Sequence, residues 1–282
     1  MIYVSTGGFS QKTGLESANL LLKSGITSIE LSGGKHDPYF ADNLSSLSDY
    51  GNLQIHNYFP PPAEPFVFNL ASSKPEVYEP SISHARTAIK LAASLDLKNC
   101  SFHAGFLVDP NFHELGKRFH AMSIQDRQKG LELFLSRVNE LAKFSSNLGI
   151  GILIENNVYS YANSKTFDEN PFLMTDCNEC LTVMNETPEN VSLLLDVAHL
   201  KVSAQTLGFS KRHFLENTKE HVLAYHLSDN DGKRDSNDPI EKDSWFWPYL
   251  RRDLSYYSLE VYGKPLHIFK SQIMLAEKIL FS

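Results

Sequence analysis

Eight short runs of β-branched, aliphatic and aromatic residues recur along the chain, and this repetition constrains the fold more than any other feature. Longer segments between them carry apolar residues three and four positions apart, which is the spacing of amphipathic helices. The runs are IYVST (2–6), TSIELS (27–32), LQIHNYF (53–59), CSFHAGF (100–106), GILIENN (151–157), VSLLLDVAHL (191–200), VLAYHLSD (222–229) and YYSLEVYG (256–263). The clearest helical segments are residues 15–25, 82–97, 126–149 and 268–280.

Apolar strands that alternate with helices are typical of parallel strands covered on the outside. Eight such units are the number that closes a (β/α)8 barrel, so we predict an α/β fold of this kind. At about 150 residues per domain the length would also allow two domains, but no linker or low-complexity tract divides the chain. We therefore predict a single barrel domain over residues 1–282. The helices after the second and seventh strands are the least regular, in residues 45–52 and 242–254.

Charge and composition exclude several classes of partner. The chain has 26 Lys and Arg against 33 Asp and Glu, a net charge of −7 (26 − 33), so it offers no basic footprint and we expect no nucleic-acid partner. We see no basic leader with an apolar core and no apolar run of about 18 residues, so we predict a cytoplasmic protein without a membrane contact. Cys177 and Cys180 form a C-x-x-C pair without a second Cys or His pair, which favours a helix start capped by Thr175 or Asp176 over a zinc site.

Ionisable side chains stand near the ends of most of the predicted strands, where barrel enzymes gather their active sites. The last four of them come from consecutive strands. Three carboxylates that converge on one point repel each other and cannot all stay ionised without a cation, so this pattern predicts a divalent metal. The residues are Glu30, His56, His103, Glu155, Asp196, His226 and Glu260, the last four being the predicted metal ligands.

The donor set indicates which ion fits. Three carboxylates and one imidazole suit Mn²⁺, Mg²⁺ or Co²⁺ better than a thiolate-rich structural zinc site would, although Zn²⁺ also fits such a set. Four protein ligands leave positions open for water or substrate oxygens. This arrangement is typical of a catalytic site with one divalent ion.

The order of these residues resembles a known family. Glu155 in LIEN, Asp196 and His199 in D-x-x-H, His226 in HLSDNDG and Glu260 in LEV follow one another as in the xylose isomerase-like TIM barrels. Within that family the chain is most similar to the sugar phosphate isomerase/epimerase group of the ketose 3-epimerase type, and the likeness spans nearly the whole chain. The resemblance implies that the two glutamates, the aspartate and the strand-seven histidine bind the metal, while the D-x-x-H histidine orients the substrate.

The same family includes metal-dependent apurinic endonucleases, whose site adds histidines on earlier strands and a D-x-H motif after strand seven. His56 and His103 lie on comparable strands here. The chain, however, reads Asp235-Ser236-Asn237 where D-x-H would stand, and asparagine replaces an imidazole ligand poorly at a transition metal. The negative net charge also disfavours a nuclease.

These observations predict a metal-dependent sugar or sugar-phosphate isomerase or epimerase, which removes a proton beside a carbonyl through a metal-stabilised enediolate. Glu155 and Glu260 are the candidate acid and base on opposite faces of the reacting carbon. A hydrolase of the apurinic endonuclease type and a barrel that binds a ligand without turnover are the alternatives.

Six further residues are candidates for contact with the substrate. His199 and His103 are expected to hydrogen-bond its hydroxyls, and His56 and Glu30 are weaker candidates beside them. Basic residues of the strand-seven loop could meet a phosphate or carboxylate, and these are Lys233 and Arg234. The aromatic stretch SWFWPYL (244–250) fits either internal packing or a contact between copies of the chain, so a homo-oligomer remains open.

Overall fold

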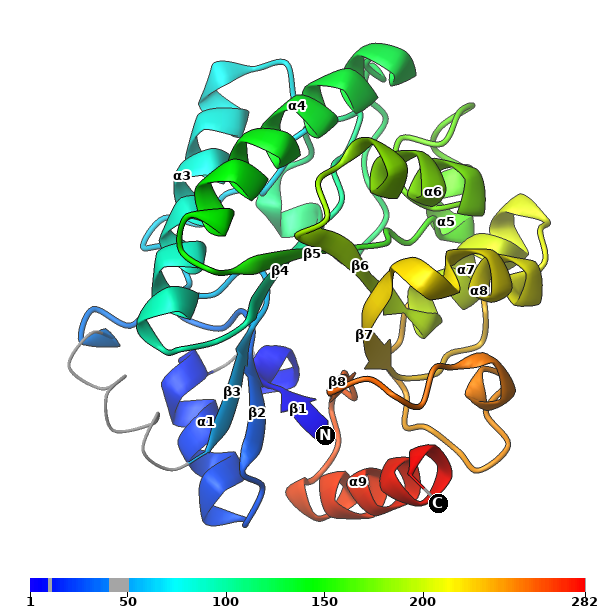
Figure 1. The fold of residues 1–282 in the computed structure, drawn as a ribbon. Helices are drawn as coiled ribbons and strands as arrows, with labels where there is room; N and C mark the ends of the chain where they lie inside the picture. Colours follow the sequence, from blue (N-terminus) through cyan, green and yellow to red (C-terminus); the bar gives the residue numbers. More distant parts are fainter. Residues whose placement is uncertain (10–11, 41–50, 282) are drawn as a thin grey trace.

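The computed structural model describes residues 1–9, 12–40 and 51–281, and these form a nearly closed barrel of parallel strands with helices around it (Figure 1). The predicted (β/α)8 fold is confirmed. Neighbouring strands pair in the order β3-β2-β1-β8-β7-β6-β5-β4. The remaining junction, between β3 and β4, is held by a bridge between His56 and Ser101. The strands are β1 (Ile2–Ser5), β2 (Ser28–Leu31), β3 (Asn52–Ile55), β4 (Asn99–His103), β5 (Gly151–Glu155), β6 (Val191–Asp196), β7 (Val222–Leu227) and β8 (Tyr256–Leu259).

Helices cover the outside of the strands, and the four clearest helical segments of the sequence are present as α1, α3, α4 and α9. Helix α3 begins at Pro75 rather than Ile82, because proline is well tolerated in a first turn and Pro80 is accommodated inside the helix. The helices are α1 (Gly14–Lys23), α3 (Pro75–Ser94), α4 (Arg127–Ser146), α5 (Tyr161–Ser164), α6 (Cys177–Glu186), α7 (Val197–Leu207), α8 (Lys211–Thr218) and α9 (Leu266–Leu280). Short 3-10 turns are η1 (Thr6–Phe9), η2 (Phe112–Glu114), η3 (Lys219–His221) and η4 (Trp247–Tyr249).

The two least regular segments have different outcomes. The predicted helix in residues 45–52 lies almost wholly outside the described residues. Residues 242–254 contain the turn η4, and their aromatic side chains pack inward, with Phe246 and Trp247 buried in the main core. None of the helices that the structure describes is both long and apolar enough to cross a bilayer.

Local signals of the sequence correspond to observed turns and caps. Gly25 and Gly149 adopt φ values of +84° and +71°, the left-handed region that glycine enters without steric cost after a helix. Asp176 caps α6 by accepting a hydrogen bond from the amide of Glu179. The Cys177–Cys180 pair therefore belongs to a capped first turn, with both thiols free and buried.

The apolar strand residues belong to two clusters, according to whether their side chains point outward to the helices or into the barrel. Alternate strand residues pack outward against the helices in the main core, for example Ile29, Phe102 and Leu193. A smaller cluster fills the barrel interior and consists of Tyr3, Leu153, Leu194, Ala224 and Tyr256. The interior positions nearer the carboxyl ends of the strands are polar and ionisable, so this alternation carries the charged side chains inward.

Long loops after β4 and β5 build a wall above the barrel. Their aromatic residues form a third cluster that includes Phe106, Phe119 and Phe172. Arg127, at the start of α4, holds this wall: its guanidinium forms a bidentate pair with Glu179 of α6 at 2.9 Å and donates to the carbonyls of Asn170 and Phe172. One arginine thus joins two outer helices to a loop at the barrel mouth.

The Arg127 network generates a prediction about stability. Replacing Arg127 by Ala removes the cationic partner of the Glu179 carboxylate, which is 9% exposed, and leaves the two loop carbonyls without their donor. We expect the free energy of unfolding to fall by about 2 kcal/mol. Urea denaturation followed by tryptophan fluorescence measures this loss.

Arg212→Ala is the matched control, because Arg212 pairs with Glu216 at 2.7 Å while both side chains are at least half exposed. Its loss should stay below about 1 kcal/mol. Equal losses for the two variants would contradict the role assigned to Arg127.

Candidate metal centre and substrate cavity

Four ionisable side chains from adjacent strands meet at the carboxyl end of the barrel. Glu155 ends β5, Asp196 ends β6, His226 lies in β7 and Glu260 directly follows β8. One ligand atom from each lies within 4.8 Å of the others, and all four residues are buried. The structure therefore brings together the four side chains that the sequence nominates as metal ligands.

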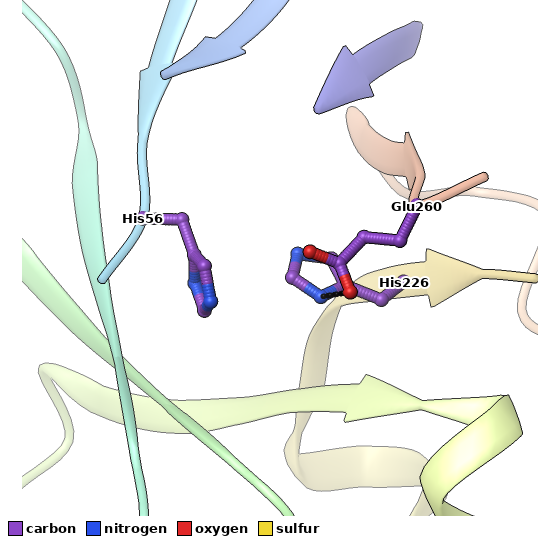
Figure 2. A group of neighbouring side chains, drawn as sticks. All are labelled: His56, His226 and Glu260. Atoms are coloured by element: carbon purple, nitrogen blue, oxygen red, sulfur yellow. Dashed lines mark ion pairs between the residues drawn. The ribbon is translucent and has the colours of Figure 1, made fainter. Parts of the chain in front are cut away.

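The two ring nitrogens of His226 face different carboxylates. Nδ1 lies 3.2 Å from Oε1 of Glu155 and 3.6 Å from Oε2 of Glu260, a pair drawn in Figure 2. Nε2 lies 2.9 Å from Oε2 of Glu30. Parallel pairing in register between β6 and β7 places Asp196 beside this histidine, with its Oδ2 3.9 Å from Nδ1.

Asp196 has one satisfied and one unsatisfied carboxylate oxygen. Oδ1 caps helix α7 by accepting a hydrogen bond of 2.6 Å from the amide of His199. The side chain of Asn156 fixes the backbone of Asp196 through two hydrogen bonds, of 2.8 and 3.2 Å. Oδ2 is buried and has no hydrogen-bond partner among the residues that the structure describes. Because buried polar atoms are nearly always paired, this oxygen facing the cluster fits the donor set of a cation site.

Burial and mutual repulsion shift the ionisation of the cluster. Burial raises the pKa of Asp196 to about 7, outweighing the opposite effect of His199. Burial likewise raises the pKa of Glu260. It opposes the charge of His226, yet the surrounding carboxylates hold the pKa of that imidazole well above its ordinary value. Burial would also raise the pKa of Glu155, but the neighbouring histidines lower it well below the usual range. The group therefore retains protons that an incoming cation would displace.

Two more histidines approach Glu155 from the strands on its other side, because His103 ends β4, which pairs directly with β5, and His56 follows β3. His56 Nε2 lies 3.2 Å and His103 Nδ1 lies 3.1 Å from Oε2 of Glu155, and the three residues form a second group with the spacing of metal ligands. Figure 2 shows the ring of His56 facing His226 and Glu260 across the barrel. Glu155 is thus shared between two groups of ligand-type side chains.

His199 stands beside the cluster and links it to the strand-seven loop. Its Nδ1 lies 2.9 Å from the carbonyl of Asn156, and its Nε2 lies 3.2 Å from Oδ2 of Asp235. The carbonyl fixes the ring, since it must accept a hydrogen bond from Nδ1. Asn237 stands where a D-x-H motif has its histidine, and its side-chain amide, with the nitrogen assigned to the position facing Asp235, donates to that carboxylate at 2.9 Å.

A cavity of about 850 Å³ opens onto the cluster, which is large enough for a small organic ligand. Five predicted site residues line it: His56, His103, His199, Arg234 and Glu260.

The other predicted residues lie away from the cavity wall. Glu155, Asp196 and His226 lie behind it. Glu30 is fully buried and contacts His226 and the Tyr256 hydroxyl instead of the cavity. Lys233 is exposed and is not among the lining residues.

Sequence reasoning missed residues that hold the ionisable groups in place. Tyr262 donates from its hydroxyl to Oε1 of Glu260 at 3.2 Å, and Ser5 approaches the same oxygen at 3.5 Å. Tyr262 follows Glu260 by two residues, so strand alternation could have placed it on the same face. Asn156 directly follows Glu155, whereas nothing in the local sequence distinguishes Ser5.

An eight-stranded α/β barrel with buried His, Asp and Glu side chains below a cavity at its carboxyl end defines a class of barrel proteins with a metal-type site. Within this class, residues 18–259 match the family model described as xylose isomerase-like TIM barrel. The chain belongs to that family. No curated protein matches it significantly.

Solved structures with the same fold share little sequence with this chain. A D-tagatose 3-epimerase-like protein is 18% identical with a TM-score of 0.70, and 99% of each chain is covered. The 3-keto-D-glucoside 4-epimerase of E. coli is 9% identical with a TM-score of 0.68 over 98% of each chain. A xylose isomerase-like TIM barrel protein from Mycobacterium smegmatis, in complex with magnesium, is 14% identical with a TM-score of 0.65 over 99% of this chain and 97% of its own.

The cluster generates a prediction about cation binding. We expect a divalent ion, at a hundredfold excess over its Kd, to stabilise the folded protein by about 2.7 kcal/mol. The melting temperature should rise accordingly. Binding must displace protons from His226 and from Asp196, whose pKa is about 7, so the apparent affinity should rise with pH between about 6 and 8. Calorimetry in buffers of different ionisation enthalpy counts the released protons.

Asp196→Asn keeps the oxygen that caps α7 but removes the charge, so we expect at least a tenfold loss of affinity. Asp176→Asn is the matched control, because Asp176 caps α6 in the same way outside the cluster. Equal affinities for the two variants would contradict the assigned site.

Proposed function

We propose that this chain is a divalent-metal-dependent isomerase or epimerase that acts on a sugar or sugar phosphate. The reaction would begin with removal of a proton from the carbon beside a carbonyl. The observation that carries the proposal is the group Glu155, Asp196, His226 and Glu260, which meets below a cavity of sugar-binding size. The known sugar epimerases that share the fold support this reading.

The donor set supports one resident divalent ion. Three carboxylates and an imidazole would hold Mn²⁺, Mg²⁺ or Co²⁺ in preference to Zn²⁺, which the same ligands could also bind. When bound, the ion supplies polarisation of the substrate carbonyl and adjacent hydroxyl. Among the residues that the structure describes, Oδ2 of Asp196 has no hydrogen-bond partner, and it lies 3.9 Å from Nδ1 of His226.

Glu260 is the better-placed proton acceptor of the two glutamates. It lines the cavity, and Tyr262 and Ser5 hold its Oε1, while its Oε2 lies 3.6 Å from Nδ1 of His226. A carboxylate fixed at one oxygen can take a proton from a substrate carbon at the other. Glu155, which lies deeper, is proposed as the acid on the opposite face of the carbon.

Neutral and basic side chains around the cavity would orient the substrate. His199 and His103 stand where they could hydrogen-bond hydroxyls, and His56 lies beside them. Arg234 lines the cavity and is the residue we propose for a phosphate or carboxylate group. We propose a weaker role for Lys233 in binding such a group, because Lys233 is exposed and does not line the cavity.

A hydrolase of phosphodiesters is the second candidate, and one observation favours it. His56, His103 and Glu155 form a second ligand-type group that shares Glu155 with the first, and paired metal sites serve hydrolysis in many enzymes. The net charge of −7 and Asn237 count against it. Cleavage of a duplex containing an abasic site, together with two ions bound per chain, would support this candidate over the first.

The proposed function predicts exchange with solvent. The metal-loaded protein, incubated with a panel of ketoses in deuterated water, should place deuterium on the carbon beside the carbonyl, because the proton taken by a carboxylate exchanges before its return. Mass spectrometry and proton NMR of the sugars detect this. Binding of a ketose without deuterium uptake would point to a ligand-binding barrel, and absence of both would contradict the proposal.

Glu260→Gln removes the proposed base while keeping the size of the side chain. At saturating metal, we expect turnover to fall by about 10²- to 10⁴-fold. Glu140→Gln is the control, since Glu140 is half exposed on α4 and pairs with Arg86. Unchanged turnover in Glu260→Gln with metal still bound would rule out this assignment, and the same test applies to Glu155→Gln.

A further inference from the structure

Glu30 and Tyr256 form a buried polar pair directly beneath the proposed metal ligands. Glu30 comes from β2 and Tyr256 from the start of β8, and they are 0% and 3% exposed. Oε2 of Glu30 accepts a hydrogen bond from the Tyr256 hydroxyl and lies 2.9 Å from Nε2 of His226. Neither residue is among those that line the cavity.

The contact between Glu30 and His226 determines which nitrogen of the imidazole carries hydrogen. An ionised carboxylate only accepts hydrogen bonds, so Nε2 of His226 must be the donor. In the neutral imidazole this leaves the lone pair on Nδ1, because the hydrogen bond of one ring nitrogen fixes the role of the other.

The Nδ1 lone pair is then directed at a set of acceptors. Its neighbours are Oε1 of Glu155 at 3.2 Å, Oε2 of Glu260 at 3.6 Å and Oδ2 of Asp196 at 3.9 Å. A lone pair and three carboxylates cannot hydrogen-bond with one another. A cation is the partner that satisfies all four, which makes the Nε2–H form of His226 the form suited to binding one.

Tyr256 restricts the position of the Glu30 carboxylate. Its hydroxyl binds the same oxygen that contacts His226, and its ring packs edge to face against Tyr3 with centroids 5.2 Å apart. Tyr256 belongs to the apolar cluster inside the barrel, so packing of its ring holds the hydroxyl in place. The carboxylate therefore has one supported orientation, the one that faces Nε2.

We propose that Glu30 and Tyr256 are positioning residues that hold His226 as its Nε2–H tautomer and so present Nδ1 to the metal. This inference rests on the proposed metal-dependent function and replaces the expected contact of Glu30 with substrate. Carboxylate–histidine–metal arrangements of this kind typically change metal affinity by about 10- to 100-fold when the outer carboxylate is altered.

Glu30→Gln tests the pair, because glutamine keeps the shape of the side chain but removes the negative charge that strengthens the hydrogen bond from Nε2. We expect the association constant for Mn²⁺, measured by calorimetry without substrate, to fall about 10- to 100-fold. Tyr256→Phe keeps the carboxylate but frees it to move, and it should cause a smaller loss.

Glu179→Gln is the matched control: Glu179 is also a buried glutamate paired with a cation, but it lies on α6 away from the cluster. It is expected to lose stability while keeping its Mn²⁺ affinity within about twofold. Comparing the two Glu→Gln variants separates positioning of His226 from general destabilisation.

A spectroscopic measurement identifies the tautomer directly. In protein with ¹⁵N-labelled histidine and bound Zn²⁺, long-range ¹H–¹⁵N correlations of His226, assigned with His226→Gln, should show a protonated Nε2 and a metal-bound Nδ1. Protonated Nδ1 in the zinc-bound wild-type protein, or unchanged Mn²⁺ affinity in Glu30→Gln, would overturn the proposal. Wild-type protein that binds Mn²⁺ as expected but exchanges no deuterium into any ketose would contradict the proposed function and leave the tautomer assignment standing.

Discussion

Mutual repulsion among buried carboxylates is the constraint on which the rest of this structure depends. Neighbouring parallel strands carry Glu155, Asp196 and Glu260 to one end of a narrow barrel, where burial removes most of the water that would screen them. Glu30 adds a fourth carboxylate beneath. His226 lies between them: its Nε2 faces Glu30, and its Nδ1 faces the other three carboxylates. A single imidazole therefore links all four.

Much of this arrangement could be predicted from the sequence, because a strand that is buried on both faces leaves a readable signal. The apolar runs predicted all eight strands, and the ionisable residues in seven of these runs marked the end where the runs converge. Asp196 illustrates this signal, because burying a carboxylate after three leucines costs free energy unless the carboxylate has partners. One of its oxygens caps helix α7 and the other faces the cluster.

Depth inside the barrel could not be predicted in the same way. Glu30 looked equivalent to the other strand-end residues, but pairing sets it level with Ser5 and Gln54, one inward position below His56. This stagger between strands is a property of the closed barrel and is not encoded in any single run. For the same reason the sequence does not distinguish Tyr256 from an ordinary apolar strand residue, although its hydroxyl donates to the carboxylate of Glu30 on another strand.

Access to the cavity separates the roles of chemically similar groups. Glu155 and Glu260 are both buried glutamates at strand ends, yet Glu260 lines the cavity while Glu155 is enclosed by histidines. Glu260 therefore has the direct contact with the cavity that removal of a substrate proton requires, whereas Glu155 is connected to the cavity through His103, which lines it. The aromatic loop residues Phe106, Phe119 and Phe172 line this cavity, and Arg127 holds their segment by donating to the carbonyl of Phe172. The outer scaffold and the inner charges therefore act together.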